Sequence, residues 1–220
     1  ANLCLATSHT INGVSELHSD ILKNDVFRDY YAIHPDKFTN VTNGITHRRW
    51  TDQANPKLGA LITDCIGDKW LTKPEKLEEL LKFQGNKQVL DKLAEIKYDN
   101  KVNLAKYIND TKGIIVDPSS MFDVQVKRIH EYKRQLLNAL HILELYFRLK
   151  DNPDLDIQPR TFIFGGKAAS AYYIAKQVTT FICALGNMIN NDPDIKGKLK
   201  AVFLDNYRVT LAEMIMPAAE

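Results

Sequence analysis

Three short apolar runs, each followed by a helical pattern, constrain the fold more than any other feature of this chain. The runs are Met121–Val126, Arg160–Phe164 and Lys200–Leu204, and helical periodicity follows over about 131–150, about 168–190 and after Arg208. Two parallel strands need a crossover between them, and an amphipathic helix usually provides it. The alternation therefore predicts an α/β fold, a doubly wound parallel sheet with helices that cover it.

The residues before the first run have a mostly helical pattern. Apolar residues recur at helical spacing over Pro56–Ile66, Pro74–Phe83 and Lys87–Asn109. Two of these segments begin with proline, which the first helical turn tolerates, and Gly67, Gly85 and Gly113 fall where helices end. Nearer the start of the chain, Leu3–Ser8 favours a short buried strand and Asn12–Asn24 favours a helix. The chain is therefore expected to begin within an α/β alternation.

Composition excludes several classes of protein. The chain has 220 residues, with 29 Lys and Arg against 27 Asp and Glu, and its net charge of +2 is too small for a protein that coats a polyanion. Cys4, Cys65 and Cys183 have no CxxC spacing, which argues against a disulfide scaffold and indicates buried thiols in a reducing cytoplasm. The histidines His9, His18, His34, His47 and His141 show no metal-ligand spacing, so no metal is expected. No apolar run approaches the roughly 20 residues that cross a bilayer, so we expect a soluble cytoplasmic protein without a membrane partner.

The densest group of charged residues follows the first apolar run. Lys127-Arg-Ile-His-Glu-Tyr-Lys-Arg134 lies where a strand is expected to give way to a helix. Ligands of open α/β sheets bind outside the carboxyl ends of the strands, and a helix N-terminus adds free N–H groups that favour an anion. Lysine and arginine on such a turn suit compact phosphate dianions. The alternative is a basic helix start that only faces solvent.

Two further strand ends carry residues of interest. Gly165-Gly166 follows the second run, and this glycine turn either lets a backbone approach an anion or serves close strand–helix packing. Asp205-Asn206-Tyr207-Arg208 follows the third run. Because the carboxyl ends of parallel strands meet at one edge of a sheet, we expect these groups to converge on one cleft with Lys127, Arg128 and Lys133.

Four segments resemble successive blocks of the α-glucan phosphorylases, the family of glycogen, starch and maltodextrin phosphorylases. They are Asn40–Trp50, Phe122–Gln135, Phe164–Ala169 and Phe203–Glu213, and the resemblance runs essentially end to end. It implies a two-domain enzyme of the glycosyltransferase-B type that contains pyridoxal phosphate and uses the phosphate of this cofactor in catalysis. Such an enzyme converts an α-1,4-glucan and inorganic phosphate into glucose 1-phosphate and a shortened glucan.

The resemblance also implies roles for individual residues. It assigns Arg128 and Lys133 to the substrate phosphate, with Lys127 beside the cofactor phosphate, and these three are the candidate catalytic residues. It assigns Asn43 and Tyr132 to glucosyl hydroxyls, and it places Tyr207 and Arg208 around the cofactor. Asn43 also belongs to a segment, Thr42–Arg49, whose own pattern predicts only a turn and a helix start, with Thr46 as a candidate cap.

The resemblance divides the chain near Asn43. Residues 1–43 would form the tail of an N-terminal domain, and residues 44–220 the first part of a nucleotide-binding-like C-terminal domain. The family's Schiff-base lysine lies in a Gly-Thr-Gly-Asn-Met-Lys block that this chain does not contain. We therefore expect a fragment of a homodimeric parent enzyme, inactive by itself.

Two other functions deserve comparison with this hypothesis. A sugar-nucleotide glycosyltransferase of the same fold could also use a basic strand end, for a diphosphate. A nucleic-acid-binding module could use Lys127–Arg134 as a basic helix. However, Leu136, Leu137, Leu140 and Leu143 predict that this helix continues as a core helix, so no nucleic-acid partner is expected.

Overall fold

A three-stranded parallel sheet in the order β3-β4-β5 lies at the centre of the larger part of the chain, in a computed structural model that describes all 220 residues. The strands are β3 (Met121–Val126), β4 (Arg160–Gly165) and β5 (Leu199–Leu204). Every residue of β4 has a partner on each side, from Met121 and Leu199 at one end to Val126 and Leu204 at the other. The predicted strands are confirmed, with bounds that differ by no more than one residue.

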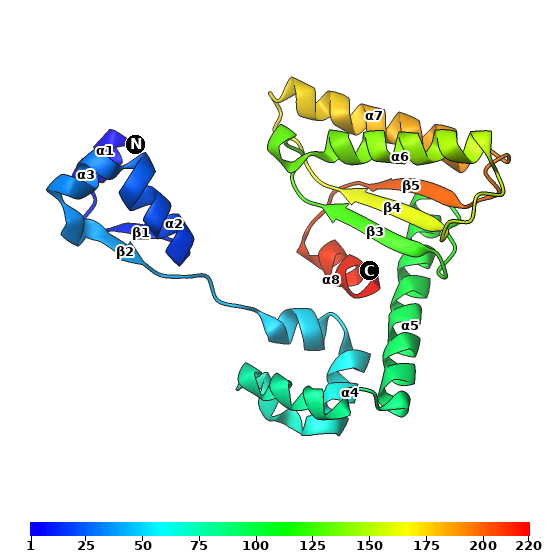
Figure 1. Cartoon of the computed structure of the whole chain (residues 1–220), viewed down its shortest axis with the longest axis horizontal. Helices are drawn as coiled ribbons and strands as arrows, with labels where there is room; N and C mark the ends of the chain where they lie inside the picture. Colours follow the sequence, from blue (N-terminus) through cyan, green and yellow to red (C-terminus); the bar gives the residue numbers. More distant parts are fainter. The chain divides into compact units, whose positions relative to one another are not determined.

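Helices cover both faces of this sheet (Figure 1). On one face, α6 (Gln135–Asp151) and α7 (Tyr173–Asn190) bury Ile142 and Ile182 against Phe162 and Phe164 of β4. On the other face, α5 (Lys87–Lys112) and α8 (Val209–Ala218) pack around Phe122. The doubly wound arrangement predicted from the sequence is therefore confirmed.

The remaining elements of the chain are short, and several agree with the predicted helical block. They are α1 (Asn2–Thr7), β1 (Ile11–Gly13), α2 (Glu16–Ile21), η1 (Leu22–Val26), α3 (Arg28–Ile33), η2 (Pro35–Lys37), β2 (Phe38–Asn40), η3 (Arg48–Gln53), α4 (Pro56–Ile66), η4 (Asp68–Leu71), η5 (Pro74–Phe83) and η6 (Glu131–Lys133). The helical segments that begin at Pro56 and Pro74 have their predicted bounds, although the second is a 3₁₀ helix. Gly113 ends α5 in the left-handed conformation that glycine favours.

The chain divides into two units, Ala1–Thr46 and His47–Glu220. In the first unit, β1 pairs in parallel with β2, and Tyr30 donates a hydrogen bond to the carbonyl of Leu5. The predicted strand over Leu3–Ser8 is wrong, because these residues belong to α1, where the N–H of Ser8 donates to the carbonyl of Cys4. The predicted helix over 12–24 begins only at Glu16, after the cap Ser15. The functional division at residue 43 stays a prediction.

Several predictions for the second unit also need correction. Thr46 does not cap a helix, since His47 occupies the N-cap position of η3. The helix predicted from about residue 168 begins at Tyr173, and the one predicted from about residue 131 begins at Gln135, after the single turn η6. The thiols are not buried: Cys4 and Cys183 are exposed and Cys65 is half-buried. No helix combines the length and the hydropathy that would let it cross a membrane.

Leucines of α6 provide a further correction. Leu136, Leu137 and Leu140 are 45%, 59% and 47% exposed, and of the four predicted core leucines only Leu143 packs against the core. The helix buries a different stripe, which consists of Ala139, Ile142, Tyr146 and Leu149. It is a core helix, as predicted, but through other residues.

A carboxylate in the loop between α7 and β5 makes stability dependent on pH. Asp192 accepts hydrogen bonds from the Tyr146 hydroxyl (2.7 Å) and the N–H of Asp194 (2.9 Å), and Lys150 lies 3.1 Å away. These contacts hold the pKa of Asp192 below its ordinary value. Because the folded pKa is depressed, this stabilisation is present above the unfolded pKa of about 3.9 and is lost as the pH falls through the folded value.

We expect Asp192→Asn to lower the free energy of unfolding at pH 7 and to have a smaller effect below about pH 4. Urea denaturation at pH 7 and pH 3 measures both values. The exposed Asp151, which forms no ion pair, provides the control Asp151→Asn. An Asp192→Asn effect of equal size at both pH values would contradict the prediction.

Candidate functional site

The carboxyl ends of the three strands lie level at one edge of the sheet. Val126, Gly165 and Leu204 are register partners, so the residues that follow them project from the same edge (Figure 1). The pairing of the first two strands continues past their ends: the N–H of Lys127 donates to the carbonyl of Gly165 (2.9 Å) and that of Ile129 to the carbonyl of Lys167 (3.2 Å). The Lys127–Ile129 turn is therefore fixed by backbone hydrogen bonds.

Three helices begin next to this edge, and no side chain accepts a hydrogen bond from their N-terminal N–H groups. The N-termini of α6, α7 and α8 have no side-chain cap and no acidic residue in the first turn. Uncapped N–H groups and the helix dipole both favour an anion at such a position. The edge is consequently suited to negative charge even before its side chains are considered.

The basic side chains at this edge are free of ion pairs. Lys127, Arg128, Lys133, Arg134, Lys167 and Arg208 have no carboxylate within 4 Å, whereas most carboxylates of the second unit are paired with cations elsewhere. Asp205, the one acidic residue that directly follows a strand here, forms an ion pair with Lys112 of α5. Unpaired cations and uncapped helices are the groups that bind a compact anion such as phosphate, and a phosphate site at this edge stays a prediction.

Two glutamines that sequence reasoning did not single out hold the basic loop in place. Gln135 is buried; its Nε2 donates to the carbonyl of Arg128 (3.1 Å), and its Oε1 accepts from the N–H of His130 (3.3 Å). Gln125 of β3 donates to the carbonyl of Lys133 (3.0 Å) and accepts from Asn138 of α6 (3.0 Å). The Gln135 amide bonds only to backbone groups, and the Gln125 amide bonds to a backbone carbonyl and to the Asn138 side chain. Neither amide occupies a cationic side chain, so these side chains stay free for a ligand.

Gly166 determines how close the two strand ends can come. A Cβ atom at this position would lie 2.2 Å from the carbonyl oxygen of Lys127, which no side chain can tolerate. At Gly165 the nearest contact of a Cβ would be a side-chain methyl of Val126 at 3.1 Å. Of the two roles weighed for the glycine pair, close packing therefore applies to Gly166, and what it packs against is the backbone of the basic turn.

We expect Gly166→Ala to lower the free energy of unfolding by about 1–3 kcal/mol, because the Lys127 backbone must move to make room. Gly165→Ala is the matched control, with a smaller expected effect because the Val126 side chain can shift. Urea denaturation of both variants measures the difference. Equal destabilisation by the two substitutions would show that the close approach at Gly166 is not the reason for the glycine.

Tyr207 and Arg208 lie at the same edge, after β5. The Tyr207 ring would be 3.5 Å from a Cβ at Gly165, so the ring packs against the end of β4. Burial raises the pKa of the Tyr207 hydroxyl. Arg208 is exposed and donates to the carbonyl of Asn206 (3.3 Å), a residue in the left-handed conformation. Tyr207 and Arg208, which were predicted together with Lys127 to bind the cofactor, thus both lie at the strand-end edge; the roles of all three stay predictions.

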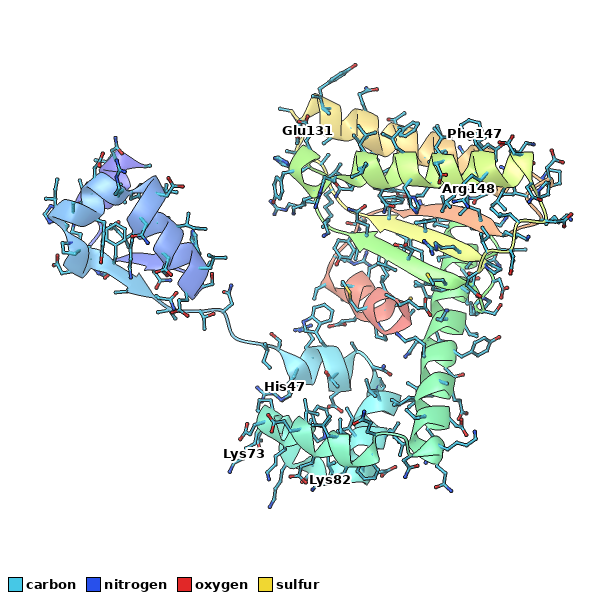
Figure 2. The ribbon with its side chains drawn as sticks, in the orientation of Figure 1. His47, Lys73, Lys82, Glu131, Phe147 and Arg148 are labelled. Atoms are coloured by element: carbon cyan, nitrogen blue, oxygen red, sulfur yellow. The ribbon has the colours of Figure 1, made fainter.

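An aromatic group lies beside the basic loop, on the turn whose Glu131 is labelled in Figure 2. His130 lies between the rings of Tyr132 (4.3 Å between centroids) and Tyr172 (5.2 Å), and the Tyr172 hydroxyl donates to Glu131. The ammonium of Lys133 lies 5.4 Å from the Tyr132 ring centroid. Sequence reasoning missed Tyr172, whose only signal was its position shortly after the second strand.

Asn43 belongs to the first unit, in the exposed segment that follows β2. It is the one predicted site residue outside the unit that contains the sheet edge. Its predicted contact with a glucosyl hydroxyl therefore stays a prediction.

Comparison with known proteins gives a consistent result over the whole chain. The carbohydrate phosphorylase family model matches residues 1–220. A glycogen phosphorylase of Haemophilus influenzae is 51% identical over 218 residues, which are 99% of this chain and 27% of that protein. The brain form from Bos taurus is 47% identical and the muscle form from Oryctolagus cuniculus 46% identical, each over all 220 residues and 26% of the relative. The chain thus spans about a quarter of the length of these relatives, and it belongs to the carbohydrate phosphorylase family.

Proposed function

We propose that this chain forms the phosphate-binding part of an enzyme that removes terminal α-1,4-linked glucosyl units from a glucan with inorganic phosphate and releases glucose 1-phosphate. The observation that carries the proposal is the set of unpaired cations beside three uncapped helix N-termini at one sheet edge. The relatives described above are glycogen phosphorylases by name. A sugar-nucleotide glycosyltransferase is not favoured, because the family that matches the whole chain is the carbohydrate phosphorylases. The homodimeric state of a parent enzyme stays a prediction.

The chemistry of phosphorolysis explains why such a site is needed. Phosphate attacks the anomeric carbon, the glycosidic C–O bond breaks, and the departing glucan oxygen must receive a proton. In this proposal Arg128 and Lys133 hold the attacking phosphate, and Tyr132 contacts a hydroxyl of the glucosyl unit. Fixed cations stabilise negative charge without reorganising during the reaction, which is usually a large part of catalysis.

The residues present also fit the phosphate end of pyridoxal phosphate, the cofactor that membership of the family implies. Lys127, Tyr207 and Arg208 would hold it, since two are cations without ion pairs and the third is a ring packed against Gly165. When bound, the cofactor would supply a phosphate group that exchanges a proton with the substrate phosphate. The positive charge of Lys127 would lie beside both phosphate groups, and its attraction to each would offset the repulsion between them.

Anion binding by the 220-residue chain tests the proposal. Phosphorus NMR with inorganic phosphate and, separately, with pyridoxal phosphate should show saturable binding that Arg128→Ala weakens about tenfold or more. Arg148→Ala is the matched control, because Arg148 lies near the opposite end of α6 (Figure 2) and pairs with Glu144. Unchanged affinity in Arg128→Ala, or an equal loss in Arg148→Ala, would contradict a specific phosphate site.

A further inference from the structure

The parallel pairing of the sheet continues into the basic turn, beyond the end of β3. The N–H of Lys127 donates to the carbonyl of Gly165, and two residues later the N–H of Ile129 donates to the carbonyl of Lys167. This spacing is that of a parallel ladder, in which every second residue of a strand bonds to the same neighbour. The peptide groups of the intervening residue, Arg128, therefore face the other side, where the sheet has no further strand because β3 is its edge.

The side chain of Gln135 takes the place of a strand on that free side. Its Nε2 donates to the carbonyl of Arg128 (3.1 Å), and its Oε1 accepts from the N–H of His130 (3.3 Å). One residue of a neighbouring parallel strand would make the same two hydrogen bonds, because its N–H and C=O bond to residues two apart. Gln135 is 1% exposed, so water does not replace these bonds when they are lost.

Hydrogen bonds on both sides of the turn determine the direction of the Arg128 side chain. Successive side chains of an extended segment point to opposite faces. Ile129 is buried in the core that α6 and α7 form with the sheet, and Arg128, directly before it, is exposed. Without the Gln135 amide, the backbone from Arg128 to His130 would be held on one side only, and the guanidinium would sample more directions.

We propose that Gln135 is a positioning residue for Arg128, and that it acts on the bound anion through the direction of the guanidinium. The inference deepens the proposed function and rests on it. Glutamine suits the position because one side chain must donate and accept at the same time without adding charge, whereas a carboxylate does not donate and a thioether offers no donor. A guanidinium that is already oriented loses less freedom when an anion binds, which raises affinity.

Amide hydrogen exchange tests the geometric part of the inference. Gln135→Met keeps the length of the side chain and removes both hydrogen bonds. We expect the His130 amide to exchange about tenfold faster or more in this variant, because Gln135 is its hydrogen-bond partner. The Ile129 amide, which is bonded to Lys167, is the internal control and should keep its protection. Unchanged exchange of the His130 amide would overturn the inference.

A double-mutant cycle on phosphate binding tests whether Gln135 acts through Arg128. By phosphorus NMR of the 220-residue chain, Gln135→Met should weaken the binding of inorganic phosphate about three- to tenfold, and less than about twofold when it is combined with Arg128→Ala. Gln125→Met is the matched control, since Gln125 bonds to the carbonyl of Lys133. Its effect should persist in the Arg128→Ala background.

The same affinities separate failure of this inference from failure of the proposed function. A loss of affinity in Arg128→Ala with none in Gln135→Met would overturn the inference alone. Equal losses from Gln135→Met with and without Arg128→Ala would also overturn it, because the effect would then not pass through the guanidinium. Unchanged affinity in Arg128→Ala would contradict the proposed function and, with it, the role of Gln135.

Discussion

Arg128→Ala is expected to reduce phosphorolysis about a hundredfold or more, because the proposed phosphate site would lose one fixed positive charge beside the attacking phosphate. The measurement needs a complete enzyme, and the Haemophilus influenzae relative provides one if its matching 218 residues are replaced by this chain. Steady-state kinetics with glycogen and phosphate as varied substrates then give kcat and the KM for phosphate. Loss of a charge that acts in the transition state lowers kcat, whereas loss of ground-state binding alone raises KM.

Two further variants of the same chimera distinguish a catalytic role of Arg128 from a structural one. Arg128→Lys keeps the charge but loses the planar fork, so its activity should fall between those of the unsubstituted chimera and Arg128→Ala. Arg148→Ala, which removes an arginine from the far end of α6, should leave the kinetics unchanged. Near-normal turnover of Arg128→Ala with saturable phosphate would show that Arg128 does not bind the reacting anion.

Phe162→Ala is expected to lower the free energy of unfolding by about 3–5 kcal/mol, which is a large fraction of the stability of a typical domain. Phe162 is completely buried in the central strand, between the two neighbouring strands and beneath α6 and α7. Truncation therefore leaves a cavity that the paired strands cannot close by moving. Urea denaturation followed by circular dichroism measures the loss.

Phe147→Ala is the matched control for this measurement. Phe147 is 55% exposed near the end of α6 (Figure 2), so its truncation removes little buried surface and should change stability by less than about 1 kcal/mol. Similar losses in the two variants would mean that the sheet is not the centre of the folding unit.

The three strands of the sheet were predictable because residue composition and hydrophobic spacing both indicate a strand. Met121–Val126 is rich in apolar and β-branched residues, and a buried central strand such as β4 needs an apolar run without helical spacing. Leu3–Ser8 is equally apolar and equally short. Nothing in its composition decides between a strand and the short helix α1 that the structure has at this place. The ambiguity is physical, since periodicity cannot be measured over six residues.

The orientation of α6 was less predictable than its existence. Its apolar residues occupy more than one side, so two different stripes satisfy the helical spacing, and the sheet packs against the stripe that contains Ala139 and Ile142. A small residue such as Ala139 lets the helix approach the strands closely, whereas leucines at 136 and 140 would hold it further away. Which stripe faces the sheet depends on the shape of the partner surface, and a single helical pattern does not contain that information.

The cations of the candidate site were predictable from their position, but the residues that hold them were not. Lys127 and Arg128 follow a strand directly, and parallel strands end at one edge. Gln135 and Gly166 act through backbone carbonyls of residues in other elements, at Arg128 and Lys127 respectively. Such partners are known only once the chain has folded, because any carbonyl is the same chemical group whatever residue carries it.

The separation between residues that hold the basic loop and residues that project from it has an evolutionary consequence. Arg128 is exposed and forms no ion pair, so selection on it can act through ligand chemistry alone, and a new specificity could arise there without a loss of folding. Gly166 and Gln135 carry no charge, yet a change at either would disturb the backbone of Lys127 or Arg128. In descendants that acquire a different substrate, we therefore expect the projecting cationic side chain to vary, while Gly166 and Gln135 are retained.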